Sequence, residues 1–266
     1  METQATGADD SGQTSGHLHP ITQVTRDVVR AFTELGFEVA DGPEVETEYY
    51  NFDALNVPKD HPARDMQDTF WLDPKTVSAY LENEGPSQSD SVILRTHTSA
   101  VQPRYMLEHE PPFRIVIPGK VFRYEATDTT HETQFFQIEG LAVDTDITLA
   151  SLKGTLATLI RKLFGSDAEI HLRPGYFPFV EPGVEIDVQC FRCGGDGCPS
   201  CKGSGWIEIL GAGMVHPNVL ANAGIDPRKY RGFAFGVGID RLVMLRYGVD
   251  DIRRLYTGDL RMVNQF

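Results

Sequence analysis

The sequence predicts an α+β fold in which an antiparallel β-sheet carries helices on one side. Strand-like runs of β-branched and aromatic residues recur through the chain, and two of them flank a polar loop like the arms of a long hairpin. Amphipathic segments with helical spacing lie between these runs. The chain has 266 residues and is 41% hydrophobic, so it can bury a sizeable core.

Composition limits the partners of the protein. The formal net charge of −14 argues against nucleic-acid binding over the whole surface, although a small basic patch or a partner subunit could still bind RNA. No run approaches the roughly eighteen apolar residues of a membrane span. Residues 1–16 are polar and lack the features of a secretion signal. We therefore expect a disordered leader, followed by one domain over residues 17–266.

The first half of the chain begins with a predicted helix that ends at Gly36. Its apolar face is formed by Ile21, Val24, Val28, Val29, Phe32 and Leu35. A strand from Phe37 to Val45 follows, with an interruption at Gly42–Pro43. The remaining pieces are an ordered loop at 49–68, a short apolar piece at 70–72, a soft connector at 82–91 and a strand at 92–94.

The second half of the chain combines most of the predicted strands with three helices. The helices are Ala100–Glu108 with Pro103 near its start, Leu149–Phe164, and one that begins near Ile239. The strands are Phe113–Ile117, Val121–Glu125, Phe135–Val143, Glu169–Arg173, Val184–Val188, Trp206–Leu210 and Gly232–Gly238. The polar loop 126–134 makes its two flanking strands an antiparallel pair.

Arg241 follows a glycine-bearing strand in the motif Gly236-Val237-Gly238-Ile239-Asp240-Arg241. Glycines leave room for a ligand against the backbone, and the first turn of a helix adds its positive dipole to the arginine. A guanidinium group binds phosphate oxygens two at a time. The motif alone is weak, because a strand packed on a helix with a solvated arginine gives the same pattern.

Arg123 is the second candidate phosphate ligand. Arg123 and Glu125 alternate with two aromatic residues, so they are expected on one face of a strand. Arg123 could bind a phosphate while Glu125 accepts a hydrogen bond from a purine amino group. A cross-strand salt bridge is the alternative, and His131 could be a solvated loop histidine. Two arginines on separate elements together suggest a polyphosphate that is held while one phosphoryl bond breaks.

Four cysteines form the pattern Cys190-x2-Cys193-x4-Cys198-x2-Cys201. Two such pairs suit tetrahedral zinc, and the nearby glycines allow tight turns. The spacing predicts a small zinc hairpin over residues 190–205 without a catalytic role. Free thiols or a redox pair are the alternatives. This clustering favours metal over disulfides and indicates a reducing, cytoplasmic location.

Several stretches carry a resemblance to a known family: Tyr49-Tyr50-Asn51-Phe52, Leu94-Arg95-Thr96-His97-Thr98-Ser99, Tyr176-Phe177-Pro178-Phe179-Val180-Glu181-Pro182 and Gly211-Ala212-Gly213-Met214-Val215-His216-Pro217. With them the chain resembles, from about His19 to Phe266, the catalytic part of bacterial phenylalanyl-tRNA synthetase alpha subunits. These are class II aminoacyl-tRNA synthetases. The resemblance implies the class II catalytic fold, with the cysteine hairpin as a small insert.

The resemblance also implies roles in binding ATP. Pro43 would be the proline of motif 1, at a subunit interface. In motif 2, Arg123 would bind the α-phosphate and Glu125 would lie near adenine, with His131 and Phe135 in its second half. Phe135 would stack on the adenine ring. Arg241 would be the arginine of motif 3 and would bind the outer phosphates. Fixed guanidinium groups stabilise the charge that develops when a carboxylate attacks the α-phosphorus.

A phenylalanine site is implied in the same way. The residues that match the family's ligands for the ammonium and carboxylate groups are His97, Ser99, Gln137 and Glu139. Gln137 and Glu139 have the spacing of one strand face. Phe177 and Phe179 would contact the substrate ring edge to face. Ala234 would set the depth of the ring pocket, with Gly236 beside the substrate. Ordinary core packing is the alternative for the two phenylalanines.

The same resemblance implies magnesium, a partner subunit and tRNA. Glu181 matches a carboxylate that binds magnesium near the beta subunit, and the expected assembly is an alpha2beta2 heterotetramer that acts on tRNA(Phe). The chain departs from the family pattern at Phe136, where histidine is usual, and at Asp240, where glutamate is usual. The short leader has no counterpart of the family's coiled-coil arm.

The predicted function is activation of phenylalanine with ATP, followed by transfer of the phenylalanyl group to tRNA(Phe). One alternative is a paralogue that forms the aminoacyl adenylate without charging tRNA. A second alternative is a non-catalytic regulatory module. Arg123, Glu139 and Arg241 speak against the second, because such a module has no need of them.

Overall fold

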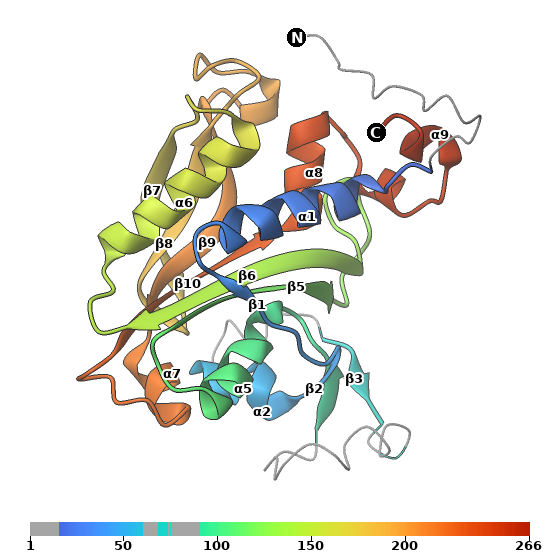
Figure 1. The fold of residues 1–266 in the computed structure, drawn as a ribbon. Helices are drawn as coiled ribbons and strands as arrows, with labels where there is room; N and C mark the ends of the chain where they lie inside the picture. The colour runs from blue at the N-terminus through green and yellow to red at the C-terminus, as the bar shows by residue number, and fades with distance from the viewer. Residues whose placement is uncertain (1–15, 61–68, 74, 76–90) are drawn as a thin grey trace.

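The centre of the molecule is a seven-stranded sheet in the order β1-β5-β6-β10-β9-β8-β7 (Figure 1). The structure, a computed structural model, describes residues 16–60, 69–73, 75 and 91–266. The strands are β1 (Glu38–Val39), β5 (Phe113–Phe122), β6 (Gln134–Asp144), β7 (Ile170–Phe177), β8 (Val180–Gln189), β9 (Trp206–Val215) and β10 (Arg231–Gly238). Only β1 and β5 pair in parallel, and the other neighbours are antiparallel. The predicted α+β class is confirmed.

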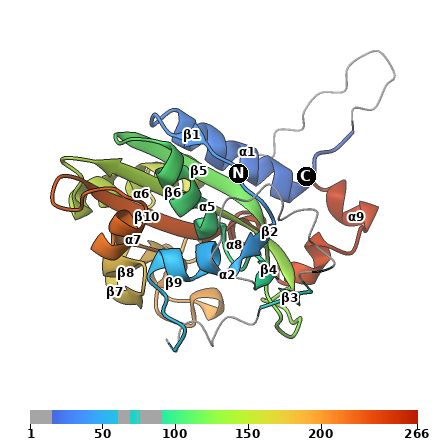
Figure 2. The same ribbon diagram turned by 90° about the horizontal axis from the view of Figure 1, so that it is seen from below.

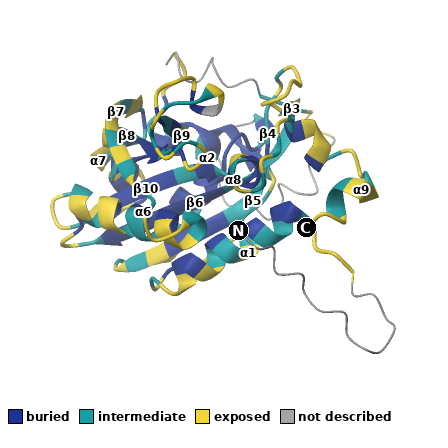
Figure 3. Cartoon of the chain, turned by 90° about the horizontal axis from the view of Figure 1, so that it is seen from above, coloured by how far each residue is buried: buried dark blue, intermediate teal, exposed yellow. Residues whose placement is uncertain are grey.

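Helices cover both faces of this sheet, whereas the sequence predicted them on one side. One face carries α1 (Pro20–Thr33), α6 (Leu149–Phe164) and α8 (Ile239–Tyr247), and the other carries α2 (Glu48–Asn51), α5 (Val101–Glu108) and α7 (Pro217–Asn222) (Figure 1). Ile138 of β6 belongs to the core under the first set, and Leu141 to the core under the second. Alternating side chains thus give the sheet two buried faces, and most residues of its central strands β6, β10 and β9 are buried (Figure 3).

Helix α1 forms as its sequence predicts. His19 caps its first turn by accepting a hydrogen bond from the backbone N–H of Ile21 at 3.2 Å, and Pro20 occupies a first-turn position where no N–H is needed. The apolar face packs on the sheet, where the ring of Phe32 stacks on that of Phe235 at 5.0 Å between centroids. Gly36 follows the helix with a φ of +81°, a conformation that glycine adopts readily.

A second sheet of three strands lies beyond the α2 and α5 side of the first, in the order β2-β4-β3 (Figure 2). Its strands are β2 (Val45–Thr47), β3 (Trp71–Leu72) and β4 (Val92–Leu94). The predicted strand 37–45 is therefore two strands in different sheets, joined through Gly42 and Pro43. Buried Arg95 fixes this crossing, because its Nη1 donates to the Gly42 carbonyl at 2.9 Å and its Nε to the Lys120 carbonyl at 2.8 Å.

Other boundaries also differ from the prediction. Strand β5 runs unbroken over residues 113–122, so Arg123 and Glu125 lie beyond its end. The loop expected at 49–68 includes most of α2 and a 3-10 turn at Asp53–Leu55, while its residues 61–68 lie outside the described residues. The leader up to residue 15 and most of the connector at 82–91 also lie outside them. Within the described ranges, every helix is too short or too polar to traverse a lipid bilayer.

Candidate active site

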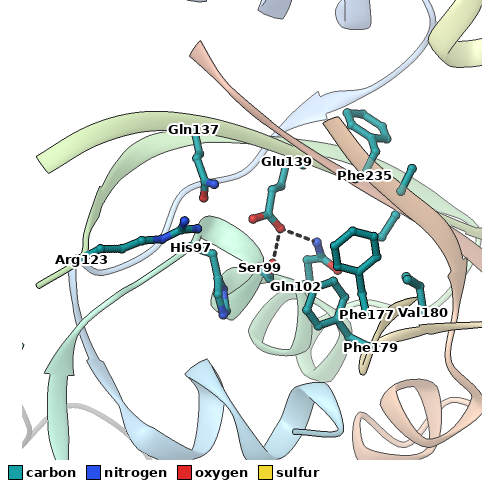
Figure 4. Close-up of a pocket in the computed structure, with 14 residues that line it drawn as sticks. His97, Ser99, Gln102, Arg123, Gln137, Glu139, Phe177, Phe179, Val180 and Phe235 are labelled. Carbon is teal, nitrogen blue, oxygen red and sulfur yellow. Dashed lines mark hydrogen bonds between the residues drawn. The ribbon is translucent and has the colours of Figure 1, made fainter. Parts of the chain in front are cut away.

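Two hollows meet at Arg123, which lines both of them. The first has a volume of about 170 Å³ and is bordered by every predicted amino acid ligand (Figure 4): His97, Ser99, Gln137, Glu139, Phe177, Phe179, Ala234 and Gly236. The second has a volume of about 160 Å³ and is bordered by every predicted nucleotide ligand: Arg123, Glu125, His131, Phe135 and Arg241. The structure therefore brings together two sets of residues that are scattered over 145 positions of the sequence, from 97 to 241.

Glu139 is the buried acid of the first hollow. It lies on β6 and is 5% exposed. The Ser99 hydroxyl donates to its Oε2, and Gln102 Nε2 donates to the same oxygen at 3.0 Å (Figure 4). Burial raises the pKa of Glu139 to about 7, against the lowering effect of these hydrogen bonds and of Arg123. A positively charged ammonium group bound in the hollow would favour the ionised form of this carboxylate.

Gly236 makes room for Glu139. The two residues pair directly across β10 and β6. A Cβ atom at position 236 would lie 3.0 Å from Cγ of Glu139, closer than side chains normally approach. A larger residue would therefore push the carboxylate away from the Ser99 and Gln102 groups that hold it. This contact gives Gly236 a physical reason to be glycine at the edge of the hollow.

Two buried polar atoms of the first hollow lack hydrogen-bond partners among the described residues, namely His97 Nδ1 and Gln137 Oε1. An unsatisfied buried polar group costs about 1–3 kcal/mol, so a ligand that bonds to it gains this energy. Gln137 and Glu139 point into the same hollow, as their spacing predicted (Figure 4). Burial, together with the charge of Arg123, lowers the pKa of His97 to about 3, so the imidazole is neutral at pH 7.

The opposite end of the first hollow is apolar. The Phe177 and Phe179 rings lie 6.0 Å apart between centroids, at the turn that joins β7 to β8. Ala234 contributes a small side chain from β10, and the structure leaves space for the Phe177 ring at Gly211, where a Cβ atom would lie 2.7 Å from it. In Figure 4, Arg123 and Gln137 lie on one side of Glu139 and the two rings on the other. The hollow suits a small zwitterion with an aromatic side chain.

The second hollow is built around the Arg123 guanidinium. Its Nε donates to the Thr96 carbonyl at 3.3 Å, and its carbon lies 5.0 Å from the centroid of the Phe135 ring. Burial lowers the pKa of Arg123, and the nearby Glu125 opposes this change. An arginine nevertheless keeps its charge in proteins. His131 borders this hollow from an exposed loop, where Oδ2 of Asp128 lies 3.0 Å from its Nδ1.

Arg241 lies in the first turn of α8, as the sequence predicted. Its guanidinium makes no hydrogen bond or ion pair with the part of the chain that the structure describes. The start of α8 is fixed by Asp240, which is 2% exposed, accepts from the Phe136 N–H at 2.7 Å and accepts from the Tyr256 hydroxyl. The two departures from the family pattern therefore contact each other. Phe136 does so through its backbone, which does not depend on its side chain.

The four cysteines lie together between β8 and β9, with their sulfur atoms within 4.8 Å of one another. Three Sγ–Sγ distances are 3.8 Å (Cys190 to Cys198), 3.9 Å (Cys193 to Cys201) and 3.7 Å (Cys198 to Cys201). A tetrahedron of sulfurs about 2.3 Å from zinc has edges of about 3.8 Å. Backbone N–H groups of Gly197 and Gly205 also donate to these sulfurs at 3.2 and 3.3 Å. The donor set therefore fits a tetrahedral metal ion.

Glu181 lies apart from both hollows. Its side chain is 77% exposed, and its Oε2 lies 3.6 Å from Nε2 of His216. Among the described residues, the four cysteines form the only group of at least three His, Cys, Asp or Glu side chains close enough to share a metal. A magnesium site at Glu181 would therefore need ligands from elsewhere, such as a partner subunit or water.

Sequence reasoning missed one polar residue of the first hollow, Gln102. It is 5% exposed and bonds to Glu139, which is 37 positions away. Its only local signal is its place three residues after Ser99, which puts the two side chains on one side of a helical turn. Tyr256 was missed as well, because its contact with Asp240 depends on how the C-terminal segment folds back.

Known proteins resemble this chain along most of its length. A family model described as the class II core domain (F) of tRNA synthetases matches residues 5–266. The phenylalanine–tRNA ligase alpha subunit of Bacillus subtilis (strain 168) is 54% identical over 253 residues, which cover 94% of this chain and 69% of that protein. The alpha subunit of the same name from Dehalococcoides mccartyi (strain BAV1) is 55% identical over 252 residues, which cover 94% and 70%.

A solved structure shares the fold. The pyrrolysyl-tRNA synthetase from Desulfitobacterium hafniense superimposes with a TM-score of 0.63 at 16% identity, and the match covers 90% of this chain and 73% of that one. At this level of identity the likeness concerns the arrangement of the sheet and helices.

Proposed function

This chain belongs to the phenylalanine–tRNA ligase alpha subunits, a family with the class II tRNA synthetase core, and from this premise we propose how its two hollows carry out the ligation. The enzyme activates phenylalanine with ATP and passes the phenylalanyl group to its tRNA. Its substrates are phenylalanine, ATP and tRNA, and the description of its relatives as alpha subunits implies a beta partner. The residues 17–266 would form the catalytic domain, with residues 190–205 as an insert.

The first hollow is the proposed phenylalanine site. Glu139 would bind the substrate ammonium. The unpaired Oε1 of Gln137 would accept a hydrogen bond from the substrate, and Nδ1 of His97 would bond to another of its polar groups. Ser99 would hold the Glu139 carboxylate in place. The benzyl ring would contact Phe177 and Phe179 edge to face, with Ala234 at the floor of the pocket. Edge-to-face contacts between aromatic rings contribute about 0.5–1.5 kcal/mol beyond the burial of their area.

The second hollow is the proposed ATP site. Phe135 would stack on adenine and Glu125 would accept from its amino group. Arg123, which borders both hollows, would bind the α-phosphate, and Arg241 would bind the outer phosphates. An oxygen of the phenylalanine carboxylate then attacks the α-phosphorus, and pyrophosphate leaves. Arg123 stabilises the charge at the reacting centre because it is already in place, so no reorganisation is required.

Metal ions and assembly complete the proposal. Zinc at Cys190, Cys193, Cys198 and Cys201 would hold the insert, since the sulfur geometry fits it. Magnesium would accompany ATP. A second magnesium would bind Glu181 near the beta subunit, in an alpha2beta2 heterotetramer. The phenylalanyl group would pass to the 2′-hydroxyl of the terminal ribose of tRNA(Phe).

The observation that carries this function is the position of Arg123 between the two hollows. With Arg123 there, the carboxylate of the amino acid would lie next to the α-phosphate of ATP. The test is ATP–pyrophosphate exchange by the chain copurified with its beta partner, with each of several amino acids. We expect exchange with phenylalanine and only weak exchange with tyrosine or leucine.

Charging of tRNA(Phe) by the same complex separates this function from its alternatives. Exchange without charging would support a paralogue that makes only the adenylate. Absence of phenylalanine-dependent exchange would overturn the assignment of the two hollows. The Arg123→Lys variant is a useful companion, because it keeps the charge but loses the planar fork, and we expect about a hundredfold lower exchange rate.

A further inference from the structure

Arg241 borders a third cleft in addition to the ATP hollow. This cleft has a volume of about 540 Å³, and Cys201, Lys202 and Ser204 of the cysteine hairpin (residues 190–205) also line it. The topology explains the juxtaposition. Strands β9 and β10 are antiparallel neighbours. The loop that leads into β9 therefore lies at the same end of the strands as the residues that follow β10. The hairpin therefore reaches the neighbourhood of the proposed outer phosphates.

Lys202 is the basic residue that the hairpin contributes to this cleft. It directly follows the cysteine ligand Cys201 and has a φ of +51°, in the left-handed region. The side chain of Lys202 is exposed and makes no hydrogen bond or ion pair with the described parts of the chain. The side chain of Arg241 likewise makes no hydrogen bond or ion pair with the described residues. The cleft thus presents two unpaired cations, one from the start of α8 and one from the hairpin.

The third basic residue of the cleft, Arg173, is already neutralised. It pairs with Glu185 at 2.9 Å, with Glu208 at 3.1 Å and with Asp187. The three carboxylates exceed its single charge, so this wall repels an uncomplexed anion. A phosphate ligand of the cleft would therefore enter as its magnesium complex, with the anion at Arg241 and Lys202.

We propose that the cysteine hairpin is a wall of the pyrophosphate site and that Lys202 binds the outer phosphates of ATP together with Arg241. The proposal rests on the function assigned to the two hollows, and it gives a role in the reaction to an insert that the sequence suggested was not catalytic. When the carboxylate oxygen bonds to the α-phosphorus, the bond from that phosphorus to the bridging oxygen breaks. The electron pair stays on the departing pyrophosphate, where Lys202 and Arg241 stabilise the added charge.

The test compares Lys202→Met and Lys202→Arg in the complex with the beta subunit. For Lys202→Met we expect the KM for pyrophosphate in the exchange reaction to rise about tenfold, with the KM for phenylalanine unchanged, because only a phosphate contact is lost. Lys202→Arg should restore most of the affinity. Lys153→Met is the matched control, since Lys153 is an exposed lysine on α6 that borders neither the two hollows nor the cleft.

Two further measurements keep the outcome clear. Calorimetry with magnesium pyrophosphate should show the same loss of affinity, independently of catalysis, and metal analysis should show that the hairpin keeps its metal. If Lys202→Met loses its metal, Lys202→Asn serves instead, since asparagine tolerates the left-handed backbone and also lacks the charge.

Equal pyrophosphate affinity in wild type and Lys202→Met would overturn the proposal, even when wild type exchanges normally. A parallel rise in the KM for phenylalanine would also count against it, because it would indicate a general disturbance of the site. A wild-type complex that lacks phenylalanine-dependent exchange contradicts the assigned function instead. In that case Lys202-dependent binding of magnesium pyrophosphate would still support the phosphate site, and its absence would refute it.

Discussion

At the scale of single residues, the protonation of Glu139 is expected to control the binding of phenylalanine. Burial raises its pKa to about 7 in the free protein, so the carboxyl group is protonated below that pH. An ammonium ligand needs the ionised form. Affinity for phenylalanine should therefore be fully present well above pH 7, be halved near pH 7, and approach a tenfold fall for each pH unit further below it. The KM for phenylalanine in the exchange reaction, measured from pH 6 to pH 8.5, checks this expectation.

The control for this pH dependence is Glu139→Gln, which keeps the shape of the side chain and removes its charge. We expect a high and nearly pH-independent KM for phenylalanine, similar to that of wild type at low pH. A wild-type KM that stays constant between pH 6 and pH 8 would show that Glu139 is not the ammonium ligand. His97 does not add a second transition in this range, because its pKa is about 3.

Ala234 is expected to limit the size of the substrate ring. Its side chain is 6% exposed and borders the apolar end of the first hollow. Ala234→Gly should enlarge this end and raise kcat/KM for para-chlorophenylalanine by about tenfold relative to phenylalanine, within the range that one group in an apolar pocket contributes. Ala142→Gly, which lies on the other face of the sheet, controls for a general loss of packing. Unchanged selectivity would remove Ala234 from the pocket floor.

At the scale of elements, the cysteine hairpin should depend on its metal. Four thiolates around one ion supply much of the folding energy of so short a segment. We expect close to one equivalent of zinc per chain, and its removal by a chelator should weaken the binding of ATP and pyrophosphate. Binding of phenylalanine, measured by calorimetry, should remain, because none of its proposed ligands lies in residues 190–205. Four titratable thiols with no bound metal in the purified protein would contradict the zinc site.

Some helices and strands could be predicted from the sequence, and others could not. The helical spacing of apolar residues and the positions of glycines predicted α1 and the start of α8. The alternation of side chains along β6 predicted that Gln137 and Glu139 share one face. These features depend on neighbours within a few residues. The split of residues 37–45 between two sheets depends instead on Arg95, which bonds to a carbonyl 53 positions away. Local patterns carry no information about such a contact.

At the scale of the whole molecule, the distribution of helices over two faces was beyond sequence reasoning, because an amphipathic helix does not reveal which face it covers. The site was more predictable than the fold around it. The resemblance assigned the ligands, and the structure places every one of the proposed ATP and amino acid residues at two adjoining hollows. Gln102 and Lys202 escaped notice because their relevance appears only when distant strands are brought side by side.

Substitution of Glu181 tests how the whole molecule assembles with the beta subunit. This carboxylate is 77% exposed, and so it is accessible to a partner chain. If magnesium joins Glu181 to the beta subunit, Glu181→Gln should weaken the complex in magnesium-containing buffer by about tenfold.

Sedimentation of the alpha and beta chains with and without magnesium measures this effect. Removal of magnesium should weaken the wild-type complex and leave the Glu181→Gln complex unchanged, because the variant has already lost the bridge. Asp146→Asn, an exposed acid in the loop after β6, is the matched control and should assemble like wild type. Equal magnesium dependence in wild type and Glu181→Gln would place the bridging ion elsewhere and leave Glu181 without a role in assembly.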